Sequence, residues 1–345
     1  MKKKSLPIGI ALTLLAGGGL AAMGSTAFAE GSATGTSTPR ALAAEQARTT
    51  SQANAEVLQQ FYTAFTKGDI EAAKSFVTSD FIMHVPGKGE NAGQYWGHKG
   101  LEKFMNNILS WNGGKFSMQV PHVAVNGDGG FTREVVDLNR KHDAERDWQL
   151  RFTMHYKFKA GKVSEAWTMP EDQRHYDAYW TAPEGGVPNA ATQVNSAATK
   201  GSPVIDISKA ANSKNLEFGR EFYKMFWEND IEGIEKVIDK DIVITIPGES
   251  DISGTFKGFA GFQEFRSKVM ATVGDRYKLD VPDMAANDKG VFAEEFIRMN
   301  RPWNSKVEPI EVTLFYTIRD GKIVKMEDIP EDTYAWETFF TNPKE

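Results

Sequence analysis

The chain has 345 residues, a formal net charge of −6 and no cysteine. Without cysteine it has no disulfides, no thiolate nucleophiles and no thiolate metal ligands. A mildly acidic chain is also a poor match for nucleic acid or an anionic membrane surface, so no nucleic-acid partner is expected. The length suits about two domains of ordinary size.

The first 29 residues have the layout of a secretory signal peptide. Lys2–Lys4 precede an apolar stretch over residues 6–23, and Ala27–Ala29 forms a small-x-small cleavage motif before Glu30. An uncleaved membrane anchor is the alternative, but glycines dilute the apolar stretch and no basic cluster follows it. We therefore predict cleavage after Ala29, a secreted or periplasmic location, and no membrane span in the mature chain.

Most of the remaining chain consists of two copies of one unit. Residues 80–89 read DFIMHVPGKG, and residues 241–250, which lie 161 positions later, read DIVITIPGES. After a one-residue deletion the offset becomes 160, as for Tyr156 and Tyr316. So constant a register indicates duplication of a whole domain. We predict a flexible leader (30–52), domain 1 (53–180), a polar linker (181–213) and domain 2 (214–345).

Within domain 1 the apolar spacing predicts helices first and strands afterwards. The expected helices lie over about 58–65, 69–76 and 100–108, and the expected strands over about 81–85, 115–125, 130–140, 148–159 and 162–169. Asp69 is placed to cap the second helix, and Asp172 to cap a short helix at the end of the domain. This order is typical of an α+β fold.

Several motifs of domain 1 are similar, in order and spacing, to those of SnoaL-like proteins in the NTF2-like (ketosteroid-isomerase-like) superfamily. They are His84–Gly87 (HVPG), Ala92–His98 (AGQYWGH), Gly161–Trp167 (GKVSEAW), and Asp172-Gln173 followed by Asp177. The resemblance covers about 54–180 and, more weakly, 215–340. It implies two tandem cone domains, each a curved antiparallel sheet wrapped around three helices and enclosing one pocket.

The resemblance also implies partners and a range of activities. Members often pair through the backs of their sheets, so the two copies could form an intramolecular pseudo-dimer. The family includes isomerases, aldol-type cyclases, dehydratases, epoxide hydrolases and binding modules, and the fold alone does not choose among them.

The two copies differ most in histidine, because all six histidines lie in domain 1. The domain 2 counterparts are Thr245 for His84, Phe259 for His98 and Phe315 for His155. A position that accepts Phe is expected to be at least half-buried, so His98 and His155 are predicted to face the pocket. Histidine titrates near neutral pH. Our hypothesis is that domain 1 is the active copy and domain 2 a degenerate scaffold; structural histidines are the alternative.

The candidate site follows from these differences. His155 and His84 are the predicted base and acid, and Tyr95 or Arg151 would stabilise charge on the reacting oxygen. The residues predicted to bind substrate are His98, Arg151, Asn139, Arg140 and Trp167. Because domain 2 repeats Asn139-Arg140 as Asn300-Arg301, a structural role is the alternative for that pair. Glu134, repeated as Glu295, is interpreted as structural for the same reason. His142 belongs to a charged loop that is either a solvated hairpin tip or a lid.

These residues predict a cofactor-free acid/base enzyme of isomerase, dehydratase or β-eliminating lyase type. Its substrate would be small or oligomeric and polar, such as an oligosaccharide with a uronate group. No nucleotide-binding, serine-elbow or zinc-helix motif is present, and the histidines lack close ligand spacing, so neither a cofactor nor a metal is expected. A non-catalytic binding module and a structural pair of cones are the alternatives. Convergence of His84, His98 and His155 on one cavity would favour the enzyme.

Overall fold

The computed structural model describes residues 39–112, 116–140, 143–181, 205–273, 277–301 and 304–341. The predicted signal peptide, His142 and most of the predicted linker lie outside these ranges. Among the helices within these ranges, none combines the length and the hydropathy that a membrane crossing requires.

Domain 1 contains every element that its sequence predicts. Its helices are α1 (Pro39–Thr66), α2 (Ile70–Ser75), α3 (Gly97–Asn112) and α4 (Gln173–Tyr179). Its strands are β1 (Val77–Val85), β2 (Gly93–Trp96), β3 (Phe116–Val125), β4 (Gly129–Arg140), β5 (Asp143–Lys159) and β6 (Lys162–Pro170). Only the short strand β2 is not predicted.

Domain 2 repeats this order of elements. Its helices are α5 (Ser213–Glu228), α6 (Ile231–Val237), α7 (Gly258–Val273) and α8 (Thr333–Phe340). Its strands are β7 (Ile238–Ile246), β8 (Gly254–Lys257), β9 (Tyr277–Ala286), β10 (Gly290–Arg301), β11 (Asn304–Arg319) and β12 (Lys322–Pro330). The structure therefore confirms the duplication and the α+β class.

Each domain arranges its strands in one six-stranded sheet. The order is β2-β1-β6-β5-β4-β3 in domain 1 and β8-β7-β12-β11-β10-β9 in domain 2. Neighbouring strands are antiparallel except for β1 with β6 and β7 with β12, which are parallel. The sheets are thus mixed, which differs from the antiparallel expectation at one pair in each domain. A parallel pair needs a long crossover, and the helix and meander between β1 and β6 provide it.

Local sequence sets the helix ends. The side chain of Asp69 accepts a hydrogen bond from the backbone N–H of Ala72, and Asp230 does the same for Gly233 in domain 2. Asp172 caps α4 as predicted, by accepting from the N–H of His175. Residues 39–52, predicted to be part of a flexible leader, instead belong to α1. The Ala, Glu, Gln and Arg residues of this segment favour a helix, which outweighs its Ser and Thr content.

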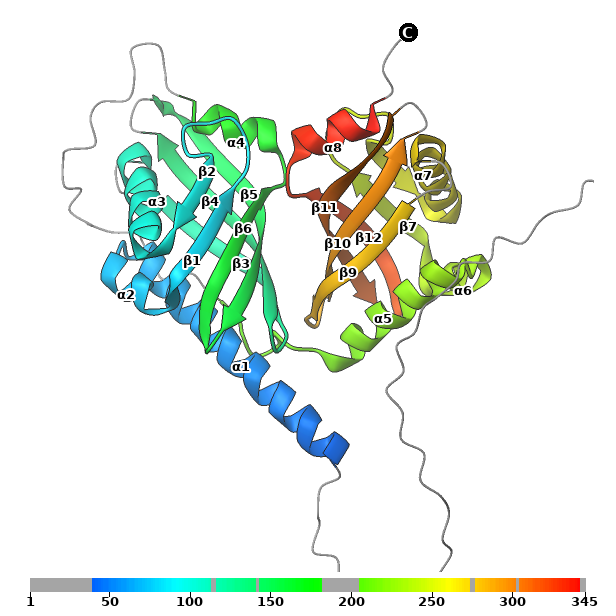
Figure 1. The fold of residues 1–345 in the computed structure, drawn as a ribbon, viewed down its shortest axis with the longest axis horizontal. Coiled ribbons are helices and arrows are strands. Elements are labelled where there is room, and N and C mark those ends of the chain that lie inside the picture. The colour runs from blue at the N-terminus through cyan, green and yellow to red at the C-terminus, as the bar shows by residue number, and fades with distance from the viewer. Residues whose placement is uncertain are drawn as a thin grey trace, which may run out of the picture.

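In each domain the helices lie against one face of the sheet, which curves around them (Figure 1). Successive residues of a strand point to opposite faces. In β5, Leu150, Phe152 and Met154 therefore point inward, toward the helices, and line a cavity. Residues at the alternate positions, including His155, point to the outer face.

The outer faces of the two sheets pack against each other. An apolar cluster lies between them, made of Ala124, Phe131, Met169, Ala285, Phe292, Phe315 and Ile329. Phe131 and Phe292 occupy equivalent positions in the two domains, and their rings stack with centroids 5.4 Å apart. Beside this cluster, Arg133 Nη1 lies 2.8 Å from Glu327 Oε2 and forms an ion pair across the interface.

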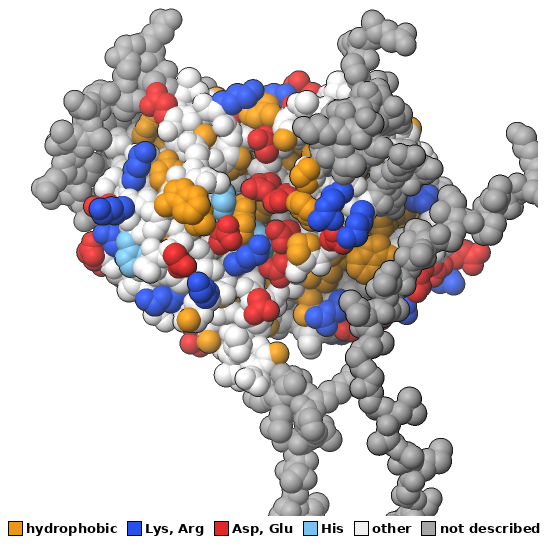
Figure 2. Space-filling view, viewed as in Figure 1, with side chains coloured by type: hydrophobic (Ala, Val, Ile, Leu, Met, Phe, Trp, Pro, Cys, Tyr) orange, Lys and Arg blue, Asp and Glu red, His pale blue; other side chains and the backbone are white. Residues whose placement is uncertain are grey.

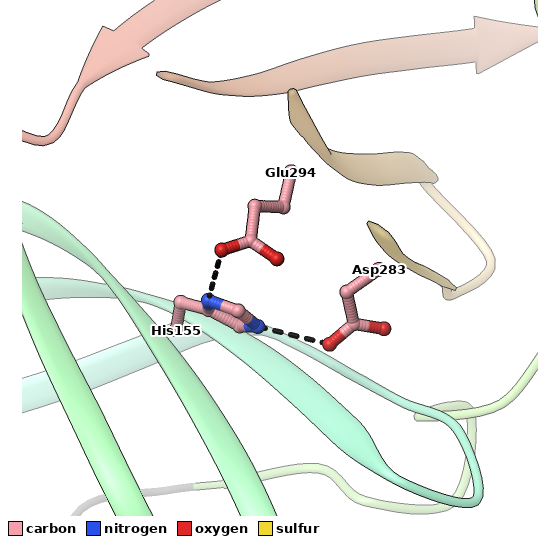
Figure 3. Close-up of side chains that lie close together, drawn as sticks. All are labelled: His155, Asp283 and Glu294. Atoms are coloured by element: carbon pink, nitrogen blue, oxygen red, sulfur yellow. Dashed lines mark hydrogen bonds and ion pairs between the residues drawn. The ribbon is translucent and has the colours of Figure 1, made fainter. Parts of the chain in front are cut away.

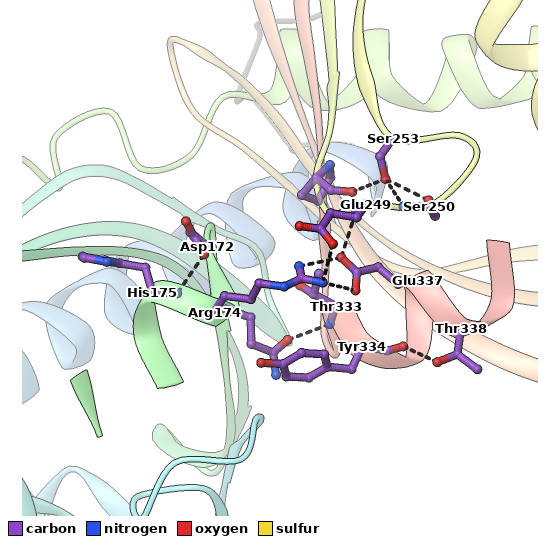
Figure 4. Close-up of polar contacts among 12 residues, drawn as sticks. Asp172, Arg174, His175, Glu249, Ser250, Ser253, Thr333, Tyr334, Glu337 and Thr338 are labelled. Atoms are coloured by element: carbon purple, nitrogen blue, oxygen red, sulfur yellow. Dashed lines mark hydrogen bonds and ion pairs between the residues drawn. The ribbon is translucent and has the colours of Figure 1, made fainter. Parts of the chain in front are cut away.

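A second set of contacts joins α4 to α8. Arg174 forms two hydrogen bonds of 2.7 Å with the carboxylate of Glu337 (Figure 4). The hydroxyl of Tyr334 donates to Asp177 Oδ2 at 2.9 Å. These polar contacts fix the two cones side by side at the helical end of the interface.

Candidate functional site

Each domain encloses a cavity between its helices and the inner face of its sheet. The domain 1 cavity is almost entirely apolar, with a lining that includes Phe61, Phe65, Phe81, Met83, Phe104, Phe116, Val136, Leu150, Phe152, Met154 and Trp180. Its volume is about 70 Å³, against about 100 Å³ in domain 2. An apolar cavity of about 150 Å³ binds benzene. A ligand with a single ring therefore needs small shifts of the lining side chains.

The polar centre of the domain 1 cavity is formed by Tyr62, Glu134 and Tyr156. The Tyr62 hydroxyl donates a short hydrogen bond to Glu134 Oε1 and lies 2.5 Å from the Tyr156 hydroxyl. Thr132 supports this centre, with its hydroxyl 2.7 Å from that of Tyr62. All four residues are buried. Burial raises the pKa of Glu134 to about 7, although the hydrogen bonds from Tyr62 and Thr132 act in the opposite direction.

Domain 2 has the same polar centre, formed by Tyr223, Glu295 and Tyr316. The Tyr223 hydroxyl donates to Glu295 Oε1 at 2.5 Å and lies 2.7 Å from the Tyr316 hydroxyl. Burial raises the pKa of Glu295 to about 7. A further buried carboxyl, Asp328, lines this cavity, and burial together with the charge of Glu295 raises its pKa well above the ordinary value. These findings speak against the hypothesis that domain 2 is a degenerate scaffold, because its cavity is not filled by side chains and it retains the two tyrosines and the glutamate of the polar centre.

None of the eight residues predicted for the site lines the domain 1 cavity. Tyr95 is buried, and its hydroxyl donates to the Asn91 side chain at 2.8 Å. His98 is half-buried on α3, with Nε2 3.5 Å from the Val77 carbonyl oxygen. Arg151 is exposed on the outer face of β5, where it contacts the side chain of Gln149. Among these three residues, Tyr95 and His98 have neighbours that indicate structural roles.

The pair Asn139-Arg140 also lies away from the cavity. Asn139 is exposed at the end of β4. Arg140 is buried and donates to the carbonyl oxygen of Thr181, while its guanidinium lies over the Trp111 ring, 5.2 Å from the centroid. These contacts support the structural alternative for Arg140.

The structure brings His84, Trp167 and His155 together on the outer face of the sheet. The Trp167 ring lies between the two imidazoles, with centroids 5.0 Å from each, and both pairs are stacked. His84 Nε2 also lies 2.9 Å from Glu165 Oε1. The two histidines therefore do not converge on the cavity, and the main support for histidine-based chemistry within the cone is lost.

His155 instead lies in the interface between the domains, where its side chain is only 2% exposed (Figure 3). Its Nε2 is 2.9 Å from Asp283 Oδ2, and its Nδ1 is 3.5 Å from Glu294 Oε1. Burial would raise the pKa of Asp283, but the hydrogen bonds from His155 and Asn126 hold it below the ordinary value. Of the clusters of His, Asp and Glu in the described residues, this one has its ligand atoms close enough for a metal ion, within 4.8 Å of one another.

The polar centre was not predicted from the sequence, for an identifiable reason. Because Glu134 recurs in domain 2 as Glu295, it was interpreted as structural, and Tyr62 and Tyr156 were not considered as site residues. The signal that could have found them is the phase of β4, in which Glu134 alternates in step with Val136 and Leu138. A carboxylate on the apolar side of a strand faces the core or a cavity.

Comparison with known proteins agrees with the two cones. The family model of the SnoaL-like domain matches residues 58–166 and again residues 219–326. No curated protein matches the chain.

Several solved structures are similar to single domains of this chain. Bal32a, from a soil-derived mobile gene cassette, is 21% identical with a TM-score of 0.35, and the match covers 37% of this chain and 96% of Bal32a. TerC, co-crystallised with polyporic acid, is 27% identical with a TM-score of 0.34, covering 37% and 98% of the two chains. An NTF2-like protein of unknown function from Burkholderia pseudomallei is 19% identical with a TM-score of 0.35, covering 38% and 100%.

The two family matches together span more than half of the chain, and each coincides with one cone and its cavity. The chain belongs to the SnoaL-like family and carries two tandem copies of its domain.

Proposed function

We propose that each cone binds a small, largely apolar molecule and exchanges a proton with it through the buried carboxyl of Glu134 or Glu295. The observation that carries this proposal is the polar centre of two tyrosines and one glutamate, which occurs in both apolar cavities. The lining favours a ligand with an apolar ring over the polar or oligomeric substrate expected from the sequence.

The chemistry follows from the environment of the carboxyl group. With a pKa of about 7, Glu134 is present in both its acid and its carboxylate form near neutral pH. It can therefore accept a proton from a carbon next to a carbonyl group and return it at another position. The Tyr156 hydroxyl lies beside that of Tyr62, and rotation of its O–H away from Tyr62 would let it donate a hydrogen bond to an enolate-like oxygen. Isomerisation and dehydration use these same parts without an organic cofactor.

A non-catalytic binding role is the second candidate. The hydroxyls and the carboxylate of the polar centre hydrogen-bond one another and are held in place by these contacts. As a fixed polar group in an apolar cavity, they would orient the oxygen of a phenol or a ketone without taking part in a reaction.

Exchange of a ketone α-proton tests the proposal directly. We expect cyclohexanone and phenol to raise the melting temperature of the protein, because they bind only the folded state. We also expect the wild type to accelerate loss of the cyclohexanone α-proton signal in D₂O, measured by NMR. The double variant Glu134→Gln, Glu295→Gln should still bind but should not accelerate exchange. The exposed outer-face variant Arg151→Gln is the matched control and should behave as wild type.

Each other outcome has a definite meaning. Binding of both probes without accelerated exchange would assign the protein to the binding role. Absence of any thermal shift with either ring would contradict ligand binding in the cones. Exchange that persists in the double variant would contradict the role of the two glutamates.

Export and pairing complete the proposal. We propose that the chain is cleaved after Ala29 and acts outside the cytoplasm, on the basis of the signal-like sequence of residues 1–29. We also propose that the two domains act as an intramolecular pair. The stacked Phe131 and Phe292 rings and the ion pair of Arg133 with Glu327 support this arrangement.

A further inference from the structure

We propose that the interface between the two domains contains a binding site for one divalent transition-metal cation such as Zn²⁺, with Nδ1 of His155 and the carboxylate of Glu294 as its first two ligands. The site lies on the outer faces of the two sheets. It is independent of both cavities and of the acid/base chemistry proposed for them.

The first argument is the position of His155. Nε2 is held at 2.9 Å by the carboxylate of Asp283, and this contact directs Nδ1 toward Glu294 (Figure 3). A histidine that binds a metal through one nitrogen commonly donates its other N–H to a carboxylate, which fixes the orientation of the ring. Asp283 is itself fixed, because Asn126 donates to its Oδ1 at 2.6 Å. The imidazole is therefore oriented as it would be for a metal at Nδ1.

The second argument is the gap between the two ligand atoms. Nδ1 of His155 lies 3.5 Å from Oε1 of Glu294, which is longer than an ordinary hydrogen bond of about 2.9 Å. Two zinc–ligand bonds of about 2.1 Å that meet at about 110° span about 3.5 Å, so the gap fits a tetrahedral Zn²⁺ ion. The other oxygen of Glu294, Oε2, is buried and has no hydrogen-bond partner among the described residues.

The third argument is the space beside the two ligand atoms. A small hollow in the interface is lined by His155 and by three carboxylates, those of Glu294, Glu311 and Glu331. A cationic side chain lies nearby, because Lys157 lines the adjacent groove together with Glu294, and its Nζ lies over the Trp167 ring, 4.6 Å from the centroid. Among the described residues, Asp283 is the residue that joins His155 and Glu294 in placing a ligand atom within 4.8 Å of the others, so Glu311 and Glu331 line the hollow without being assigned as ligands, and water would complete the coordination. Imidazole and carboxylate together suit Zn²⁺.

Solvent reaches this part of the molecule. Asp283, Glu294 and Lys157 also line a groove between the domains, which gives an ion a route to the site. Figure 2 shows acidic side chains gathered near the centre of this face, where the two domains meet.

The equivalent place on the other side of the interface serves as an internal control. There Phe315 replaces His155, His122 replaces Asp283 and Arg133 replaces Glu294. The centroid of the Phe315 ring lies 5.2 Å from that of His122 and 5.4 Å from the Arg133 guanidinium. Within the part of the chain that the structure describes, this side holds no cluster of His, Asp and Glu side chains with ligand atoms within 4.8 Å of one another, so the site is predicted once per chain.

Titration of the whole metal-free chain with ZnCl₂ tests the proposal. By isothermal calorimetry we expect one Zn²⁺ per chain, and a rise in melting temperature that EDTA reverses. His155→Phe, which copies Phe315, and the isosteric Glu294→Gln should each lower the affinity at least about 100-fold. Asp283→Asn, which only alters positioning, should lower it about 10–100-fold. His84→Thr, which copies Thr245 and removes the other histidine–carboxylate contact, should leave it unchanged.

A Co²⁺ titration gives a readout that does not depend on stability, because the visible absorption of Co²⁺ reports its coordination by protein ligands. The spectrum should appear with wild type and with His84→Thr, and not with His155→Phe. No binding by the wild type, or weak binding that survives His155→Phe, would overturn the proposal and leave His155 as a bridge between two carboxylates.

Discussion

The cavities of the two domains share one polar centre, whereas the outer faces of their sheets carry different charges. Inside, the Tyr–Glu–Tyr arrangement of domain 1 is repeated in domain 2. Outside, the equivalent pairs differ in charge or character: His122 with Asp283, Arg133 with Glu294, Arg151 with Glu311 and His155 with Phe315. The interior has kept its polar centre in both copies, while the surface between the copies has diverged.

This difference follows from joining two copies in one chain. In a symmetric homodimer the same patch meets itself, so an ion pair on one side is repeated on the other. In a single chain the two patches can change separately. Arg133 of domain 1 thus bridges Glu171 of its own domain and Glu327 of domain 2, and His155 faces Asp283 and Glu294. The charged contacts of the interface are therefore not repeated by symmetry.

The largest expected effect comes from making the two outer faces alike. Arg133→Glu copies Glu294 and leaves Glu171 and Glu327 facing a third carboxylate instead of a cation. Breaking a buried ion pair costs about 3–5 kcal/mol, and we expect the free energy of unfolding to fall by about this amount in urea. The control is Arg151→Glu, which copies Glu311 at an exposed position and should change stability by less than about 0.5 kcal/mol. Equal effects of the two variants would contradict the bridging role of Arg133.

The next effect tests whether the two cavities are equivalent. Each glutamate has a folded pKa of about 7 and an ordinary value of 4.5. Between these values the folded state keeps a proton that the unfolded state has released. The stability from burying the neutral acid is therefore present below pH 4.5 and is lost as the pH rises through 7.

Glu134→Gln and Glu295→Gln remove this titration. The difference in free energy of unfolding between each variant and wild type should therefore shift by about 3 kcal/mol in favour of the variant between pH 4.5 and pH 8. Urea unfolding at both pH values measures the change. In domain 2 the charge of Glu295 also raises the pKa of Asp328, so Glu295→Gln should change the pH dependence at least as much as Glu134→Gln does. A smaller change for Glu295→Gln would overturn the equivalence of the cavities.

The smallest effect concerns the tyrosines. Tyr62→Phe and Tyr223→Phe each remove the hydroxyl that donates to the buried glutamate. A neutral hydrogen bond contributes about 1 kcal/mol and one to a charged acceptor about 2 kcal/mol. The loss of stability should therefore be about 1 kcal/mol at pH 5 and about 2 kcal/mol at pH 8. Losses that do not depend on pH would show that neither hydroxyl stabilises the carboxylate.

Much of the fold could be predicted from local sequence. The apolar alternation of β5, the cap at Asp69 and the constant offset between copies depend on neighbouring residues or on simple counting, and the structure agrees with each. The parallel pairing of β1 with β6 was not predicted, because strand neighbours distant in sequence are chosen by packing.

The sequence by itself determined the family, the tandem organisation and which side chains share a strand face. It could not decide which face is concave, because a period of two assigns His155 and Arg151 to one side without naming that side. Comparison with Phe315 correctly indicated that His155 is buried. Only the tertiary structure decided that the burial comes from the second domain. Two packed sheets bury their outer faces as well as their inner ones, so a buried strand position can face a partner sheet instead of a pocket.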